Sequence, residues 1–191
     1  MRAAASIELD EGELVDVRVE GARHIGAAFG RARFVDVELV RCELAGCDFS
    51  EAVWERVTLV ECRASGIDLS RSRLRHVTFD ACKLDDSNLR MAHLRDVHFR
   101  DCVLVDSDFG AAQCERVDCA GSDLGRADLS KMRAKQLDLR GARLGDIKGA
   151  TSLGGATITG DQLVTLASAL AAAVGLRIAP ADEDDGRGDE S

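Results

Sequence analysis

The sequence predicts an all-β solenoid of about seven coils, followed by a C-terminal α-helix. Three observations predict this fold. Every aromatic residue falls on one register of an unbroken five-residue repeat, a small or β-branched residue precedes that register by two positions, and a second period of twenty residues is superimposed. The aromatic residues are Phe29, Phe34, Phe49, Trp54, Phe79, Phe99 and Phe109.

The five-residue repeat predicts short extended segments and excludes a helical repeat. From Leu9 to Leu144 there are 28 repeat centres, and 23 of them are Leu, Phe, Val or Trp. A helix with 3.6 residues per turn cannot keep a spacing of five on one face. In an extended backbone, residues two apart share a face, so the centre and the small residue before it point inward together. The chain must then turn before the next unit.

The twenty-residue period predicts four sides per coil. Valine recurs at Val17, Val37, Val57, Val77, Val97 and Val117, and cysteine recurs at Cys42, Cys62, Cys82 and Cys102. Four units of five residues therefore close one coil, and seven coils at a strand spacing of ~4.8 Å make a rod roughly 34 Å long. Each coil buries its interior against its neighbours, which is typical of a solenoid.

A capping helix is predicted after the last coil. Thr159 and Gln162 match a capping box, and Asp161 puts an acid in the first turn. The apolar face of the helix consists of Leu163, Leu166, Leu170 and Val174, with Gly175 as the residue after the C-cap. We expect this helix to cover the last coil, and two interpretations stay open: a lid alone, or a lid that also pairs with a second copy. Residues 176–178 are expected to form a short strand.

These patterns divide the chain into a repeat domain at residues 1–150, a capping and dimerisation segment at 151–180, and an acidic tail at 181–191. The tail carries six acids against Arg187, so most of the formal net charge of −9 lies there, and we expect it to be disordered. The mildly acidic remainder disfavours direct nucleic-acid binding, which needs a basic surface. The N-terminus lacks a secretory signal and no apolar stretch is long enough to span a membrane, so a cytoplasmic protein is expected.

One side of the predicted rod carries an acidic column, which we define as Asp48, Glu51, Asp68, Asp108 and Asp128. Glu8, Asp10 and Glu11 extend it towards the N-terminus. The following side is net positive and includes Arg73, Arg75, Arg95, Arg133 and Lys135. Two interpretations of the aspartates stay open. A short polar side chain before each centre can hydrogen-bond backbone at a turn, or the carboxylates can attract a basic partner.

No arrangement of residues indicates catalysis, a metal or a cofactor. All seven cysteines fall on inward registers and no CxxC pair occurs, which favours a role as small core residues. His24 is a repeat centre, and His76, His93 and His98 fall on outward positions without a nucleophile partner. We therefore expect a protein that is not an enzyme.

The segments "CDFSE", "SDFGA", "SDLGR", "ADLSK" and "IDLSR" resemble the pentapeptide-repeat consensus over about residues 7–147. The resemblance implies a right-handed quadrilateral β-helix. Residues 157–178 ("TITGDQLVTLASALAAAVGLRI") also resemble the C-terminal extension of the Qnr-type quinolone-resistance proteins, which dimerise through that end.

The Qnr-type resemblance implies a DNA mimic that occupies the DNA-binding saddle of DNA gyrase, a type II topoisomerase, and shields it from fluoroquinolones. The acidic column would then face gyrase, and Leu163, Leu166, Leu170 and Val174 would form a homodimer interface. The alternative is a pentapeptide-repeat scaffold that binds another cytosolic protein, in which case the aspartates are structural.

Overall fold

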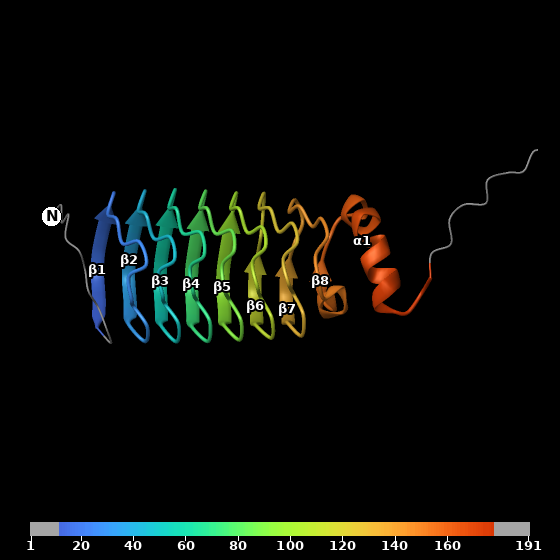
Figure 1. Cartoon of the computed structure of the whole chain (residues 1–191), viewed down its shortest axis with the longest axis horizontal. Helices are drawn as coiled ribbons and strands as arrows, with labels where there is room; N and C mark the ends of the chain where they lie inside the picture. Colours follow the sequence, from blue (N-terminus) through green and yellow to red (C-terminus); the bar gives the residue numbers. More distant parts are fainter. Residues whose placement is uncertain (1–11, 178–191) are drawn as a thin grey trace, which may run out of the picture.

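The computed structural model describes residues 12–177 and contains one parallel sheet of eight strands in sequence order (Figure 1). The strands are β1 (Glu13–Glu20), β2 (Arg33–Val40), β3 (Val53–Val60), β4 (Arg73–Asp80), β5 (His93–Arg100), β6 (Gln113–Asp118), β7 (Arg133–Asp138) and β8 (Ala156–Thr157). Between β1 and β7 each strand pairs with the next at an offset of twenty residues, as Trp54 does with Leu74. The chain is thus a right-handed quadrilateral β-helix of about seven coils, as predicted.

Each coil has four sides, which we number by their repeat centres. The strands supply the first side, with centres from Leu14 to Ala134, and the second side, with centres from Val19 to Leu139. The third and fourth sides are joined by single parallel bridges between coils, such as Glu43 with Arg63 and Asp48 with Asp68. Their centres run from His24 to Leu144 and from Phe29 to Leu129.

The corners between sides are made by residues in the left-handed backbone region. From residue 16 to residue 146, the residue two positions after each centre has a positive φ, as in Asp36 (54°) and Ala111 (57°). Only six of these corners are glycine, so most place a Cβ where left-handed backbone costs free energy. Backbone hydrogen bonds to the next coil, such as Ala111 N to Ser130 O at 2.9 Å, hold these corners in place.

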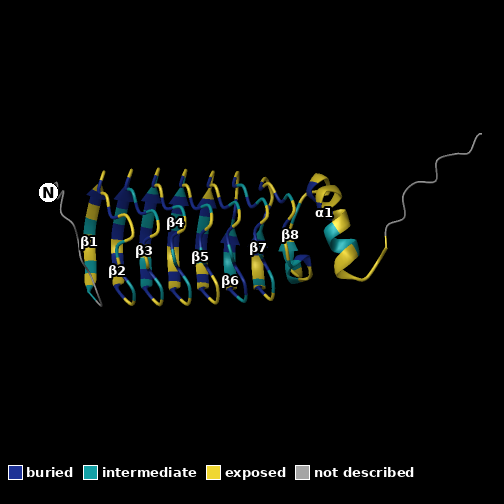
Figure 2. Ribbon diagram, in the orientation of Figure 1, coloured by how far each residue is buried: buried dark blue, intermediate teal, exposed yellow. Residues whose placement is uncertain are grey.

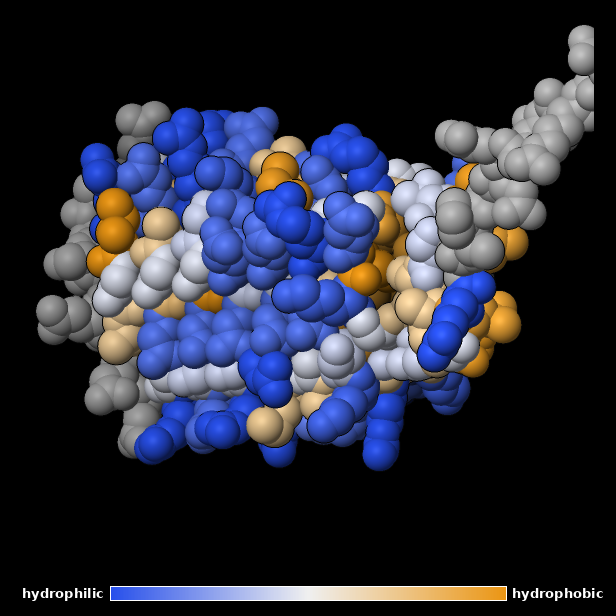
Figure 3. All heavy atoms as spheres, turned by 45° about the vertical axis from the view of Figure 1, so that its right-hand side comes forward, coloured by the Kyte–Doolittle hydropathy of each residue, from blue (hydrophilic) through white to orange (hydrophobic). Residues whose placement is uncertain are grey.

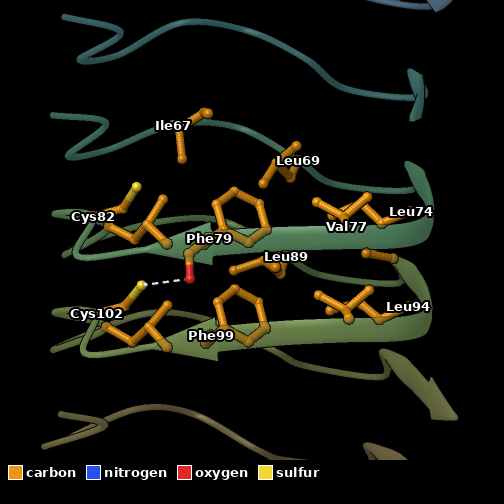
Figure 4. Packing of buried hydrophobic residues seen from close by; sticks show 14 of the residues in the cluster. Ile67, Leu69, Leu74, Val77, Phe79, Cys82, Leu89, Leu94, Phe99 and Cys102 are labelled. Atoms are coloured by element: carbon orange, nitrogen blue, oxygen red, sulfur yellow. Dashed lines mark hydrogen bonds between the residues drawn. The ribbon is translucent and has the colours of Figure 1, made fainter. Parts of the chain in front are cut away.

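The repeat centres form one continuous core along the axis. Phe79 and Phe99 are almost fully buried, and their ring centroids stack 5.0 Å apart (Figure 4). Buried residues, dark blue in Figure 2, alternate along the coils with residues that are intermediate or exposed. The inward prediction for the centres is therefore confirmed by the core.

The C-terminal end is covered by η1 (Ala150–Leu153) and α1 (Gly160–Ala173). The predicted capping box is present: the Thr159 N–H donates to Gln162 Oε1 at 2.8 Å, and the Gln162 N–H donates to Thr159 Oγ1 at 3.3 Å. Gly175 has a φ of 79° and ends the helix with its N–H bonded to Ala172 O. No strand is assigned at residues 176 and 177, and residue 178 lies outside the described residues. The short strand of this end is β8, before the helix.

Gln162 has a second role that the sequence pattern did not indicate. Its side-chain amide donates to Leu139 O at 2.5 Å and to Ala142 O at 2.7 Å. Both carbonyls lie just after β7, where the regular coils end, and Leu139 O also accepts from the Ala142 N–H at 3.0 Å. One residue therefore begins the helix and satisfies part of the open end of the rod.

Candidate partner-binding faces

The aspartates of the acidic column cap the turns of the fourth side. Each accepts a hydrogen bond at Oδ1 from the backbone N–H two residues later: Asp48 from Ser50 (2.7 Å), Asp68 from Ser70 (2.7 Å), Asp108 from Gly110 (2.7 Å) and Asp128 from Ser130 (2.8 Å). Asn88 makes the same bond to Arg90 at 3.1 Å. These four aspartates, which we call the Asp ladder, therefore stack one per coil except where Asn88 intervenes.

Part of the acidic column is neutralised by neighbouring arginines. Glu51 lies between Arg31 and Arg71, at 3.6 Å and 3.7 Å. Asp108 Oδ2 accepts from Arg90 at 2.9 Å. Within the described residues, Asp48, Asp68 and Asp128 have no ion pair within 4 Å. The extension at Glu8, Asp10 and Glu11 lies outside the described residues.

Hydrogen bonding favours the charged state of Asp128. Hydrogen bonds from the Ser130 hydroxyl and backbone N–H hold the pKa of Asp128 below its usual value. A hydrogen bond to the charged form stabilises it, so this carboxylate stays ionised while it caps the turn. One oxygen of each ladder aspartate thus accepts from backbone; the other accepts from Arg90 in Asp108 and can meet solvent or a partner in Asp48, Asp68 and Asp128.

The residues expected to form a dimer interface differ in how far they are buried. Leu166 is 1% exposed and Leu170 packs against the same core, so these two attach the helix to the last coil. Leu163 and Val174 are 51% and 73% exposed. Val164 and Leu176 add to this exposed apolar surface, which gathers at the helical end of the rod (Figure 3).

Ion pairs between coils were missed at the sequence level, although the twenty-residue period contains the signal. The Arg56 guanidinium donates to both oxygens of Asp36 at 2.6 and 2.8 Å, and Arg116 does the same to Asp96 at 2.5 and 2.8 Å. These bonds hold the pKa of Asp36 and of Asp96 below the usual value. Opposite charges twenty residues apart stack on adjacent coils, and that spacing could have identified them.

Cysteine and histidine occupy the positions expected from their registers. All seven cysteines are buried and unpaired, and burial raises the pKa of Cys114 to about 12. Cys102 donates from Sγ to Phe79 O at 3.4 Å (Figure 4). Within residues 12–177, no three His, Cys, Asp or Glu side chains gather in a way that could hold a metal ion. His24 lies edge-on to Phe29, and burial lowers its pKa.

The fold and the repeat together define a protein class, a four-sided β-helix built from five-residue units. Models of the pentapeptide-repeat region match residues 32–109 and 53–129, and models of eight pentapeptide repeats match residues 13–50 and 112–147. The chain therefore belongs to the pentapeptide-repeat family.

Three solved structures illustrate its neighbours. A trypsin-treated variant of QnrB1, a plasmid-mediated fluoroquinolone resistance protein, is 19% identical with a TM-score of 0.47, covering 91% of this chain and 98% of that chain. Full-length QnrB1 is 19% identical with a TM-score of 0.42, covering 86% and 98%. HetL from the cyanobacterium Nostoc, involved in heterocyst differentiation regulation, is 19% identical with a TM-score of 0.29, covering 75% and 90%. No curated protein sequence matches significantly.

No helix among the described residues combines the length and the apolar character needed to cross a membrane.

Proposed function

We propose that this chain is a non-enzymatic rod that binds DNA gyrase, a type II topoisomerase, as a mimic of DNA. The observation that carries the proposal is the Asp ladder, a line of carboxylates held by backbone hydrogen bonds along a straight side of the rod. Its rungs are ~4.8 Å apart. Phosphates on one strand of duplex DNA are ~3.4 Å apart along the axis. Because Asn88 interrupts the ladder, Asp68 and Asp108 are two rungs, or ~9.6 Å, apart. A basic surface of the partner would meet a row of negative charge on this rod that is less dense than the row on DNA.

The resemblance of residues 157–178 to the Qnr-type C-terminal extension motivates the choice of gyrase. A DNA-binding saddle is basic, so complementary fields would accelerate the encounter and select the partner. The expected consequence is competition with DNA for the enzyme, and with it protection from fluoroquinolones, which act on the enzyme–DNA complex.

A second candidate function is a scaffold that binds another protein, with the Asp ladder serving only the fold. The capping bonds favour it, because each aspartate has a structural reason to be present without any partner. The Arg90–Asp108 pair also favours it, since a phosphate mimic gains nothing from an adjacent cation.

One variant separates the two candidates. Asn88 already caps its turn in the native chain, so asparagine at the four ladder positions should keep the caps while removing four charges. We expect native protein to inhibit gyrase supercoiling and to reduce fluoroquinolone-induced cleavage. The variant with Asp48→Asn, Asp68→Asn, Asp108→Asn and Asp128→Asn should lose both effects while it unfolds at nearly the native urea concentration.

One result would reject the gyrase proposal, and another would reject the role of the Asp ladder in it. Native protein without effect on supercoiling at micromolar concentration would remove the partner. An asparagine variant as active as the native chain would leave gyrase binding but assign the ladder to the fold alone.

We also propose that the exposed apolar surface of α1 forms a homodimer. Leu163 and Val174 support it, because a cluster of exposed apolar side chains at one end of a rod is typical of a contact surface. Leu163→Glu with Val174→Glu should halve the mass measured by light scattering, and Leu163→Ala with Val174→Ala provides the milder control. If light scattering gives the native protein the mass of one chain, the dimer is excluded.

A further inference from the structure

A basic groove of about 520 Å³ crosses the outer surface of the first side between β4 and β7. Its cations are Arg73, Arg75, Arg95, Arg133 and Lys135, and the lining also includes His93 and one acid, Glu115. We call this site the basic groove. In β1–β3 the same side carries a different balance, with Glu13, Asp16, Asp36 and Glu55 against Arg33 and Arg56. The sign of charge therefore reverses along one side of the rod.

The groove coincides with a change in the core beneath it. Phe34, Trp54 and Leu74 are the inward centres of β2–β4, whereas β6 and β7 have Cys114 and Ala134 at the same position. Ala134 and Cys114 line the groove from below. Because these inward side chains are small, they fill less of the space beneath the sheet at β6 and β7. The long arginine side chains at the edges of the groove add to its depth.

Within the described part of the chain, three arginines of the groove lack a counter-charge, whereas Arg95 and Lys135 lie 3.8 Å and 3.6 Å from Glu115. Among the described residues, most arginines have a carboxylate within 4.0 Å; the exceptions are Arg73, Arg75, Arg100, Arg133 and Arg177. Three of these five exceptions line the one groove. Arg75 also lies directly opposite Arg95 in the β4–β5 register. Like charges at that position are unfavourable, so an anion that binds there relieves repulsion as well as adding contacts.

The chemistry of the groove favours an acidic peptide. Guanidinium groups bind carboxylates in a bidentate manner, and the columns of cations extend over three rungs, or ~14 Å. All aromatic side chains of the chain are buried, so the groove has no surface on which bases could stack, as single-stranded nucleic acid requires.

The chain itself contains such a peptide beyond helix α1. Residues 182–190 have the sequence DEDDGRGDE and lie outside the described residues. Helix α1 ends over the first side of the final coil: Val174 and Leu153 line one apolar cavity, and a Cβ on Gly155 would lie 3.8 Å from Ala134 O of β7. From Arg177 the chain can extend ~17 Å to Asp182 and ~43 Å to Glu190, compared with ~14 Å for the length of the groove itself.

We propose that the basic groove is a binding site for an acidic peptide, and that residues 182–190 of this chain are its ligand. The site is independent of the acidic column, which lies on a different side of the rod, so gyrase binding is not required. Intramolecular attachment gives the segment an effective concentration of millimolar order, which is enough to occupy a site of modest affinity.

The test uses a fluorescent peptide of residues 179–191 and two full-length proteins, followed by anisotropy. One protein is native, and in the other the six acids of 182–190 are replaced by their amides. We expect the amide variant to bind the peptide at least tenfold more tightly than native protein, because native protein carries its own competitor. Adding Arg73→Glu and Arg133→Glu to the amide variant should weaken binding at least tenfold.

Arg100→Glu in the amide variant is the matched control, because Arg100 is exposed and unpaired but lies on the second side. It should change peptide affinity less than twofold. Equal affinity of native protein and amide variant would overturn the assignment of residues 182–190. A twelve-nucleotide single-stranded DNA that binds the amide variant more tightly than the peptide would overturn the peptide class. Absence of peptide binding to the amide variant would overturn the site.

Discussion

The first and fourth sides of this rod use charge in opposite ways. On the fourth side, Asp48, Asp68 and Asp128 bond to backbone, and Asp108 bonds to backbone and to Arg90. On the first side between β4 and β7, Arg73 and Arg133 have no such partners among the described residues. The aspartates of the fourth side are therefore hydrogen-bonded within their own turns and serve the fold. The two arginines of the first side have no such role and are available to bind a ligand.

The largest change in the free energy of unfolding is expected when the side chains of the Asp ladder are truncated. Alanine at residues 48, 68, 108 and 128 removes four capping bonds, each worth about 1 kcal/mol, so the free energy of unfolding should fall by about 4 kcal/mol. Asparagine at the same positions should cost about 1 kcal/mol in total, since Asn88 makes the bond naturally. Urea unfolding measures both, and equal losses for alanine and asparagine would show that charge, not capping, stabilises the turns.

A pH titration tests the capping role of Asp128, whose carboxylate accepts hydrogen bonds from the Ser130 hydroxyl and backbone N–H. The pKa of Asp128 is lowered in the folded state, whereas an unfolded aspartate has a pKa of about 3.9. Its stabilisation is therefore fully present above about pH 5 and is lost as the pH falls through the unfolded and then the folded pKa.

Asp128→Asn should accordingly reduce the loss of the urea midpoint between pH 5 and pH 3. Arg73→Gln, on the first side, should leave that loss unchanged because guanidinium does not titrate there. A native midpoint that stays constant over this range would contradict the assigned role of Asp128.

Replacing the corner residue between the fourth and first sides by glycine should stabilise the protein. Ala111 has a φ of 57°, and its N–H bond to Ser130 O does not depend on the side chain. Ala111→Gly should raise the free energy of unfolding by about 0.5–1 kcal/mol, because glycine adopts this conformation without steric cost. Ala112→Gly, which removes a buried inward methyl from the neighbouring residue, is the control and should destabilise the protein.

The smallest effect is expected in the basic groove. Arg73→Ala removes a side chain that has no carboxylate partner in the described residues, so the free energy of unfolding should change by less than about 0.5 kcal/mol. Arg116→Ala, which removes the bidentate pair with Asp96, is the comparison on the same side. A larger loss for Arg73 than for Arg116 would mean that the groove cations stabilise the fold.

The inward half of this structure follows directly from the sequence, and the outward half does so only in part. Burial selects Phe79 and Phe99 at fixed spacing, so the period alone predicts the coil, its sides and its core. The capping box at Thr159 is a local pattern and is equally legible. The left-handed corners were not predicted, because a residue type such as the aspartate at Asp36 does not by itself indicate a positive φ.

Outward contacts depend on side-chain reach across coils. The Arg90–Asp108 pair joins residues eighteen apart, a spacing that the repeat does not suggest. The basic groove depends on side-chain volume under the sheet as well as on charge, because Cys114 and Ala134 fill less space than Trp54. Counting the charges on each side therefore identifies the positive side, but it does not identify the basic groove.

The left-handed corner at every fifth residue has a consequence for how such a chain can change. Deleting five residues, for example 111–115, would leave every later centre pointing inward while rotating all later outward residues by a quarter turn. Arg133 would then move from the first side to the fourth, and the groove would be dismantled although the core remained intact. Deleting twenty residues would shorten the rod by one rung and leave each face in place. Insertions and deletions in multiples of five therefore let the surface be rearranged independently of the interior.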